Sequence, residues 1–172
     1  MKYYFTAVAL LIMGCSILTA QNKEDKAKSG VIKTEISTLV SGFNFYQLGY
    51  EFNIQEKNSL QIGVGFGTQD EINVYALNIQ SRFYLNSWTN SKPPRGFHIG
   101  PRVAVIYGES NHSSLYTGKQ TAFGFELDGL FGYQFLIGDI VALDPYVGPG
   151  VAIFNNQTQF GLILGVTLGV AF

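Results

Sequence analysis

The sequence is poor in cysteine and in charge. Cys15 is its single cysteine, and only 13% of its 172 residues are charged, against roughly 25% in an ordinary soluble domain. A hydrophobic fraction of 47% excludes an intrinsically disordered chain. The formal net charge of -1 leaves no basic surface for nucleic acid. We therefore expect one folded domain that binds neither DNA nor RNA.

Motifs for metals and cofactors are also missing. The sequence contains no zinc-ligand spacing, no paired-cysteine motif and no nucleophile elbow. Gly63, Gly65 and Gly67 alternate along the chain, but no helical segment follows them as it does in a phosphate-binding loop. We expect no metal site and no organic cofactor.

The first twenty residues have the layout of a secretory signal peptide. Lys2 precedes the apolar stretch 6–12, and the segment reaches small residues near Ala20. Leu18 departs from the small residue usual three positions before the cleavage site. Cleavage after Ala20 would leave a mature chain without cysteine, so no disulfide could stabilise it.

A lipoprotein signal is an alternative, because residues 12–15 loosely resemble a lipobox that ends in Cys15. The sequence otherwise predicts three parts: a signal peptide over 1–20, a flexible periplasmic lead-in over 21–30 and a folded domain over 31–172.

Long hydrophobic runs are absent beyond residue 20, where no stretch reaches the about 18 apolar residues that a membrane helix needs. The chain instead has 20 glycines and segments that alternate with a period of two, which predicts strands. Most of these segments are close to the 9–11 residues of a membrane-crossing strand. We expect eight strands, at 31–40, 43–53, 59–67, 72–85, 97–108, 121–136, 140–153 and 159–172.

The two faces of these strands differ in kind. In the last segment the even-numbered residues from 162 to 172 are apolar, whereas most odd-numbered ones are small. Glycine fits the narrow lumen of an eight-stranded barrel but would weaken the outer surface of a soluble strand. The glycine-containing face therefore points inward, and it also holds the strand charges Lys33, Glu35, Glu51, Arg82, Arg102, Glu126, Asp128 and Asp144.

This division predicts an all-β fold, a closed antiparallel eight-stranded up-and-down transmembrane β-barrel, because closure leaves no unpaired edge in lipid. With both chain ends in the periplasm, one rim gathers an interfacial ring of aromatic residues: Tyr50, Phe52, Phe83, Phe97, Tyr133, Phe135 and Phe172. The segment Asn86–Gly96 is long for a periplasmic turn. If one strand is miscounted, the loops assigned to the outside lie in the periplasm, and those assigned to the periplasm lie outside.

The eight inward charges predict a paired polar network that fills the lumen, joined by Gln47, Asn78, Gln80, His98 and Gln134. Glu126 and Asp128 would also suit a metal or acid–base chemistry, although Arg102 on the adjacent strand explains them as an ion pair. Small residues predict a shallow pocket open to the outside, unless Phe45 fills it: Ser37, Gly63, Gly65, Gly67, Gly148 and Gly150.

The candidates for catalysis are His112 and Ser114, in the outer loop Glu109–Gln120. A histidine two residues before a serine resembles the catalytic pair of lipid A deacylase barrels. The asparagine usual after that serine is missing, however, and the alternative is a polar loop.

Six stretches, taken in order, resemble a family of small bacterial outer-membrane β-barrel domains of unknown function. They are LGYE (48–51), SLQIGVG (59–65), RFYL (82–85), GFHIGP (96–101), GYQ (132–134) and PYVG (145–148). The resemblance covers roughly residues 33–155. It implies a barrel in the outer membrane of a Gram-negative bacterium, and it implies no catalytic residues.

We expect a small integral outer-membrane protein without an open pore, with a structural or surface-interaction role. Its partners would be membrane lipid and extracellular molecules that contact Glu109–Gln120 and Phe154–Thr158. Two alternatives remain open: a lipid-modifying enzyme of the deacylase kind, and a soluble lipocalin-like carrier with the two faces reversed.

Overall fold

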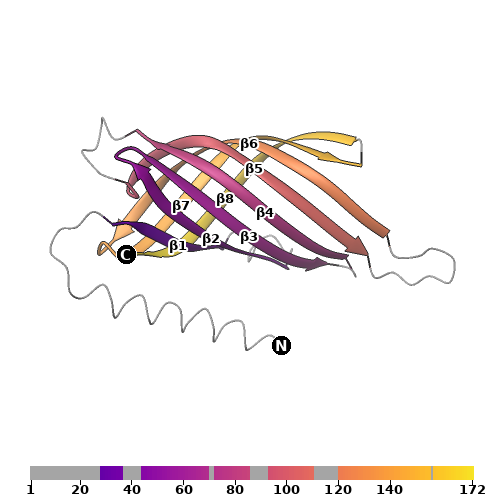
Figure 1. Cartoon of the computed structure of the whole chain (residues 1–172), viewed down its shortest axis with the longest axis horizontal. Coiled ribbons are helices and arrows are strands. Elements are labelled where there is room, and N and C mark those ends of the chain that lie inside the picture. The colour runs from indigo at the N-terminus through magenta and orange to yellow at the C-terminus, as the bar shows by residue number, and fades with distance from the viewer. Residues whose placement is uncertain (1–27, 37–43, 70–71, 86–92, 111–119, 156) are drawn as a thin grey trace, which may run out of the picture.

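The computed structural model describes residues 28–36, 44–69, 72–85, 93–110, 120–155 and 157–172. These residues form eight strands (Figure 1). The strands are β1 (Gly30–Glu35), β2 (Asn44–Gln55), β3 (Asn58–Gln69), β4 (Ile72–Tyr84), β5 (Gly96–Ser110), β6 (Gln120–Ile137), β7 (Val141–Phe154) and β8 (Gln157–Ala171).

Each strand pairs antiparallel with its neighbours in the sequence, and β1 closes the barrel by pairing with β8. The closing register runs from Val31 opposite Ala171 to Glu35 opposite Thr167. Backbone amides of Ser29 and Gly30 donate to the carbonyl oxygen of Phe172 at 2.8 and 3.2 Å. The predicted up-and-down eight-stranded barrel is therefore confirmed, and both ends of the barrel domain lie at one rim.

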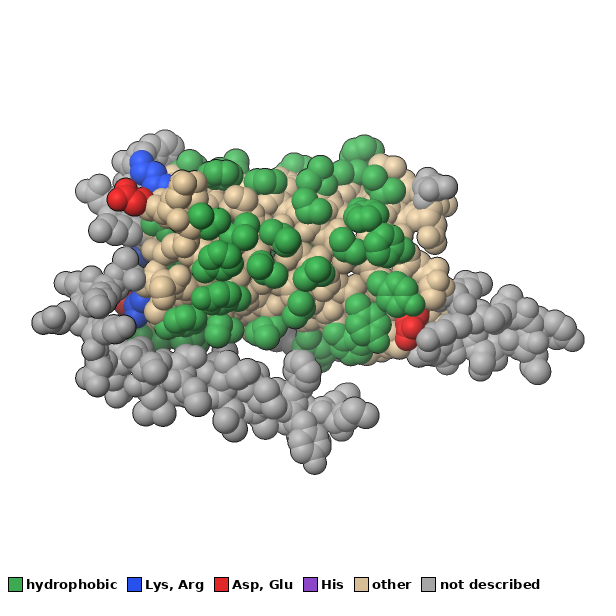
Figure 2. Space-filling model, viewed as in Figure 1, with side chains coloured by type: hydrophobic (Ala, Val, Ile, Leu, Met, Phe, Trp, Pro, Cys, Tyr) green, Lys and Arg blue, Asp and Glu red, His purple; other side chains and the backbone are tan. Residues whose placement is uncertain are grey.

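The two faces of the wall are divided as the alternation predicts. Val103 and Leu127 point outward and are 48% and 53% exposed, whereas Arg82 points inward and is 1% exposed. Hydrophobic side chains cover the visible wall between the two rims, and the charged side chains in view lie near its ends (Figure 2). The soluble carrier with reversed faces is therefore excluded, because its apolar side chains would fill the interior. The described part of the chain contains no helix with the length and hydrophobicity of a membrane span.

Strand ends differ from the predicted ones mainly at β1 and β5. β1 ends at Glu35, and residues 37–40, predicted to continue it, lie outside the described residues. β5 continues to Ser110 and therefore includes Glu109. Glu109 is two residues after the lipid-facing Tyr107 and belongs to the same, outward face of the strand. The prediction that all strand charges share the glycine face is thus wrong at this position, where the strand ends at the outer rim.

Aromatic residues gather at both rims. At the rim of the chain ends, Tyr50 stacks on Phe52 and Phe172 with ring centroids 5.7 and 6.1 Å away. Tyr133 at the same rim contacts Phe97 at 4.5 Å and Phe135 at 4.4 Å. These contacts confirm the predicted aromatic rim. The opposite rim has a second aromatic row that was not predicted, formed by Phe66, Tyr75 and Tyr107.

The connection between β4 and β5 lies at the rim of the chain ends, because the count of eight strands holds. Its residues 86–92 are outside the described part, but Pro93 and Pro94 are buried. Gln134 Nε2 donates to the Pro94 carbonyl at 2.5 Å, and Asn53 Nδ2 donates to the Pro93 carbonyl at 3.3 Å. This end of the long turn therefore folds against the lumen opening.

The predicted signal peptide and most of the lead-in, residues 1–27, also lie outside the described residues. Lys28 is described, and its carbonyl oxygen accepts a hydrogen bond from Asn53 Nδ2 at 2.8 Å. The last residues before the barrel are therefore held to the rim.

Candidate functional site

The half of the lumen nearer the chain ends is filled by a polar network centred on Arg82. Arg82 Nη1 lies 2.5 Å from Asp144 Oδ2 and 3.5 Å from Glu51 Oε2. Its Nη2 donates to Gln80 Oε1 at 3.0 Å. His98 Nε2 lies 2.8 Å from the other oxygen of Asp144. One guanidinium on β4 thereby connects side chains of β2, β5 and β7 across the lumen.

Lys33 is the second cation of this network. Its Nζ lies 2.5 Å from Glu51 Oε2 and 3.3 Å from Asp144 Oδ2, and it donates to Gln134 Oε1. Glu51 Oε1 accepts hydrogen bonds from Ser59 Oγ at 2.5 Å and from Tyr84 OH at 2.6 Å. Two cations thus face two carboxylates, and the formal charges of Lys33, Arg82, Glu51 and Asp144 cancel.

This network leaves little room for solvent. Its four charged side chains are each at most 1% exposed, and His98 and Gln134 are fully buried. Buried charges are tolerated only when they are paired and hydrogen-bonded, and here every charge contacts two opposite charges. We call Lys33, Glu51, Arg82, His98, Gln134 and Asp144 the lumen plug.

A second, smaller ion cluster lies nearer the outer rim. Arg102 Nε donates to Asp128 Oδ2 at 2.6 Å, and Arg102 Nη2 donates to Glu126 Oε1 at 2.9 Å. The structure therefore contains the ion pair that explains Glu126 and Asp128 without a metal. Across the described residues, no three His, Cys, Asp or Glu side chains gather as a metal site requires.

Glu35, the remaining inward acid, belongs to neither group. Tyr146 OH donates to Glu35 Oε2 at 2.7 Å, and the backbone amide of Val166 donates to Oε1 at 3.0 Å. The carboxylate thus ties the last paired residue of β1 to β7 and β8.

The sequence did not single out Tyr84 and Tyr146 as partners of inward acids. Tyr84 lies two residues after Arg82 on β4, and Tyr146 lies two residues after Asp144 on β7. Each tyrosine is therefore on the inward face of its strand. Their spacing of two residues from an inward charge was the available signal.

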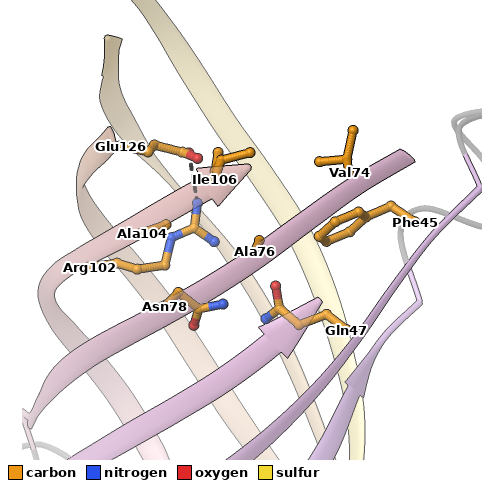
Figure 3. Close-up of a pocket in the computed structure, with 9 residues that line it drawn as sticks. All are labelled: Phe45, Gln47, Val74, Ala76, Asn78, Arg102, Ala104, Ile106 and Glu126. Atoms are coloured by element: carbon orange, nitrogen blue, oxygen red, sulfur yellow. Dashed lines mark hydrogen bonds and ion pairs between the residues drawn. The ribbon is translucent and has the colours of Figure 1, made fainter. Parts of the chain in front are cut away.

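A pocket of about 230 Å³ lies between Arg102 and the outer rim (Figure 3). Its lining comes from β2, β4, β5 and β6 and consists of Phe45, Gln47, Val74, Ala76, Asn78, Arg102, Ala104, Ile106 and Glu126. The wall is mainly apolar, and the polar groups of Arg102, Asn78 and Glu126 form one side of it.

The pocket predicted from glycines is wrong in its position. A Cβ on Gly65 would overlap the Phe45 ring, and one on Gly63 would lie 2.8 Å from Asn78 Oδ1. A Cβ on Gly150 would likewise overlap Asp128 Oδ1. These glycines accommodate neighbouring side chains, so the space above them is filled. Ser37 lies outside the described residues.

His112 and Ser114 also lie outside the described residues, as does most of the outer loop 109–120. The geometry of the proposed catalytic pair is therefore not part of the structure.

Sequence comparisons find no relative: no protein-family profile matches the chain, and no curated protein matches it. Solved structures do match its fold. The N-terminal β-barrel domain of Pseudomonas aeruginosa OprF aligns with a TM-score of 0.53 and 12% identity, covering 86% of this chain and 100% of that one. Neisserial surface protein A (NspA) aligns with a TM-score of 0.57 and 11% identity, covering 84% of this chain and 94% of that one.

The Yersinia pestis outer membrane protein Ail, solved in a phospholipid bilayer nanodisc, gives a TM-score of 0.50 at 9% identity and covers 85% of this chain and 100% of that one. All three are small eight-stranded outer-membrane barrels. This is the kind of protein that the six sequence stretches resemble. At such low identity the comparison establishes the transmembrane barrel fold.

Proposed function

We propose that this protein is a small integral protein of the bacterial outer membrane whose sealed barrel supports contacts outside the cell and does not conduct ions. The observation that carries the proposal is the lumen plug, in which Arg82 of β4 and Asp144 of β7 meet across the barrel at 2.5 Å.

The outer surface supports a place in a membrane. Every strand from β2 to β8 carries large apolar side chains that are between 38% and 85% exposed. Such a surface would aggregate in water, and acyl chains would cover it. The export signal expected in residues 1–20, the aromatic rims and the outer-membrane barrels among the structural neighbours favour the outer membrane over other bilayers.

The plug supports a role other than a pore. A water-filled channel needs a wider barrel than eight strands provide, because side chains fill an interior of this size. Here the filled section also contains the balanced charges of the plug, which an entering ion would have to separate. The functional contacts are then made at the outer end of the barrel. There β5 ends at Ser110, and β6 begins at Gln120. We assign the contacts with extracellular partners to the loop 109–120 and to the β7–β8 turn.

Conductance in planar lipid bilayers tests the sealed lumen. We expect the wild-type barrel to show no steady ion current. The double variant Lys33→Ala and Arg82→Ala removes both cations of the plug and should admit transient currents. A steady current through the wild-type protein would contradict the proposal.

Epitope tags test the compartment and the orientation. A tag within the loop 109–120 should be detected on intact Gram-negative cells that express the protein. A matched tag in the β2–β3 turn, between Glu56 and Lys57, should be detected only after the outer membrane is opened. Detection of both tags in the buffer-soluble fraction, or detection of the turn tag alone on intact cells, would contradict the proposal.

A further inference from the structure

The pocket beside Arg102 is a small apolar cavity at the outer end of the lumen. Its volume of about 230 Å³ exceeds the roughly 150 Å³ of an apolar cavity that binds benzene. It is smaller than the about 300–1,000 Å³ of a pocket for a drug-sized ligand. Val74 lies two residues from the outer end of β4, and Ile106 lies four residues from the outer end of β5. The pocket thus has room for about one ring, close to the outer rim.

The inner face of β4 and β5 changes from polar to apolar at this pocket. From the plug outward, the inward residues are Arg82, Gln80 and Asn78 before Ala76 and Val74 on β4, and Arg102 before Ala104 and Ile106 on β5. The two changes occur side by side, because Ala76 is the register partner of Ile106 and Asn78 is that of Ala104. The short side chains of Ala76 and Ala104 leave the space, and Phe45 bounds it from β2 (Figure 3).

The polar groups beside the pocket are already paired or lean away from it. Arg102 donates to Asp128 at 2.6 Å and to Glu126 at 2.9 Å. Among the described lining residues, Asn78 alone has a buried polar atom without a hydrogen-bond partner. Its amide lies over Gly63 of β3, where a Cβ would be 2.8 Å from Oδ1. A charged or hydrogen-bonding ligand group would therefore lose its hydration and find no unpaired partner here, which is costly.

The pocket has no exit through the barrel. Its inner side is the ion cluster of Arg102, Glu126 and Asp128, and beyond it lie the charges of the lumen plug, each at most 1% exposed. Strands β2 to β6 are each paired with their neighbours, so their wall separates the pocket from the surrounding lipid. A molecule that enters from the outer rim would be held there and would not pass to the periplasm. A membrane acyl chain would have to leave its leaflet to reach the same space.

We propose that this pocket binds a small neutral hydrophobic molecule from outside the cell, about the size of one aromatic ring, between Phe45, Ala76 and Ala104. Burial of its apolar surface supplies the driving force, and the volume of the pocket limits its size. An anion is disfavoured, because one cation and two carboxylates leave the neighbouring ion cluster with a formal charge of -1. This binding site is additional to the contacts that we assign to the outer loops.

NMR of the purified full chain in phosphatidylcholine nanodiscs, isotope-labelled at the alanine methyl groups, tests the proposal. We expect toluene to shift the Ala76 and Ala104 methyl signals saturably and to give nuclear Overhauser effects to both. The Ala142 methyl, which is buried two residues from Asp144 of the plug, should not shift. Benzyl alcohol should bind about tenfold or more weakly than toluene, because its hydroxyl loses hydration in the pocket. Benzoate should show no saturable binding.

Two variants on one strand separate the pocket from the lipid. Ala104→Leu fills the space inside the barrel and should abolish the saturable shift of the Ala76 signal. Val103→Leu enlarges the neighbouring side chain, which is 48% exposed on the outer wall, and should leave toluene binding unchanged. If Ala104→Leu loses its strand signal in circular dichroism, Ala76→Leu replaces it with Ala104 as the reporter. The Overhauser effects in the wild-type chain test the site without any variant.

Four results would overturn the proposal. A shift that grows without saturation, or that is as large at Ala142, shows partition into the lipid only. Overhauser effects from lipid acyl chains to Ala104 that toluene does not displace show a lipid tail in the pocket. The other two are equal binding of toluene and benzoate, and binding that Ala104→Leu leaves unchanged. None of these results bears on whether the barrel is sealed, because the lumen plug is a separate set of residues and conductance tests it.

Discussion

Arg82 and Asp144 are 62 residues apart in the sequence, and their side chains meet at 2.5 Å inside the barrel. Their strands, β4 and β7, are not neighbours in the sheet, so the contact crosses the lumen. It joins opposite walls of the barrel at a level where Glu51, His98 and Gln134 fill the remaining space. The inward charges thus help hold the barrel together and also block it.

Removal of the Arg82 charge should destabilise the barrel strongly. Arg82→Met leaves Glu51 and Asp144 buried with fewer partners, and breaking such a pair typically costs about 3–5 kcal/mol. Arg95→Met is the matched control, because Arg95 is half exposed and lies 3.9 Å from Asp139 at the rim. We expect the control to change stability by less than about 1 kcal/mol. Urea unfolding in detergent measures both, and equal effects would show that the plug adds no stability.

A charge placed on the outer wall should cost stability according to its depth. Leu127 lies midway along β6, and Leu127→Arg should cost about 2–4 kcal/mol, as arginine does at the centre of a bilayer. Ile137 faces outward at the end of the same strand, so Ile137→Arg should cost only about 0–1 kcal/mol. Unfolding in lipid vesicles measures both values. A cost at Ile137 that matches or exceeds the cost at Leu127 would contradict the assigned membrane span.

Close packing between β6 and β7 should make Gly148 irreplaceable. A Cβ there would overlap the carbonyl oxygen of Gly129, and a backbone atom cannot give way as a flexible side chain can. Gly148→Ala should therefore cost about 1–3 kcal/mol or more. A Cβ on Gly161, on the partner strand β8, would meet no atom of the described residues within 4 Å, so Gly161→Ala should stay within about 0.5 kcal/mol. Similar unfolding free energies for both variants would rule out the close approach.

The fold could be predicted because side chains alternate along a strand, so that one period-two pattern assigns every residue to a face. The glycines then identified the inner face. Arg82, Arg102 and Asp144 were assigned to that face because they alternate in step with the glycines. The grouping of these charges was not predictable, because contacts across the lumen depend on strand tilt and stagger. The outer end of β5 was also missed, since a strand can extend past the membrane, where Glu109 is tolerated.

The pocket shows a second limit of the sequence. Gly65 and Gly63 suggested empty space, but Phe45 and Asn78 from neighbouring strands lie over them. Which side chain covers a glycine depends on register and side-chain rotamer, and neither follows from alternation alone. The observed pocket lies instead beside Ala76 and Ala104. Both are small residues, and the alternation along their strands predicts that they face inward.

The orientation of the wall is the central claim, and spin labels on two adjacent residues of β5 test it most directly. Val103→Cys and Ala104→Cys, each in a chain with Cys15 replaced, carry a nitroxide in lipid vesicles. The label at Val103 should collide often with oxygen, which is soluble in lipid, and rarely with a water-soluble nickel complex. The label at Ala104 should lack this preference for oxygen. The reverse pattern, with Val103 shielded from lipid and Ala104 exposed to it, would contradict the account.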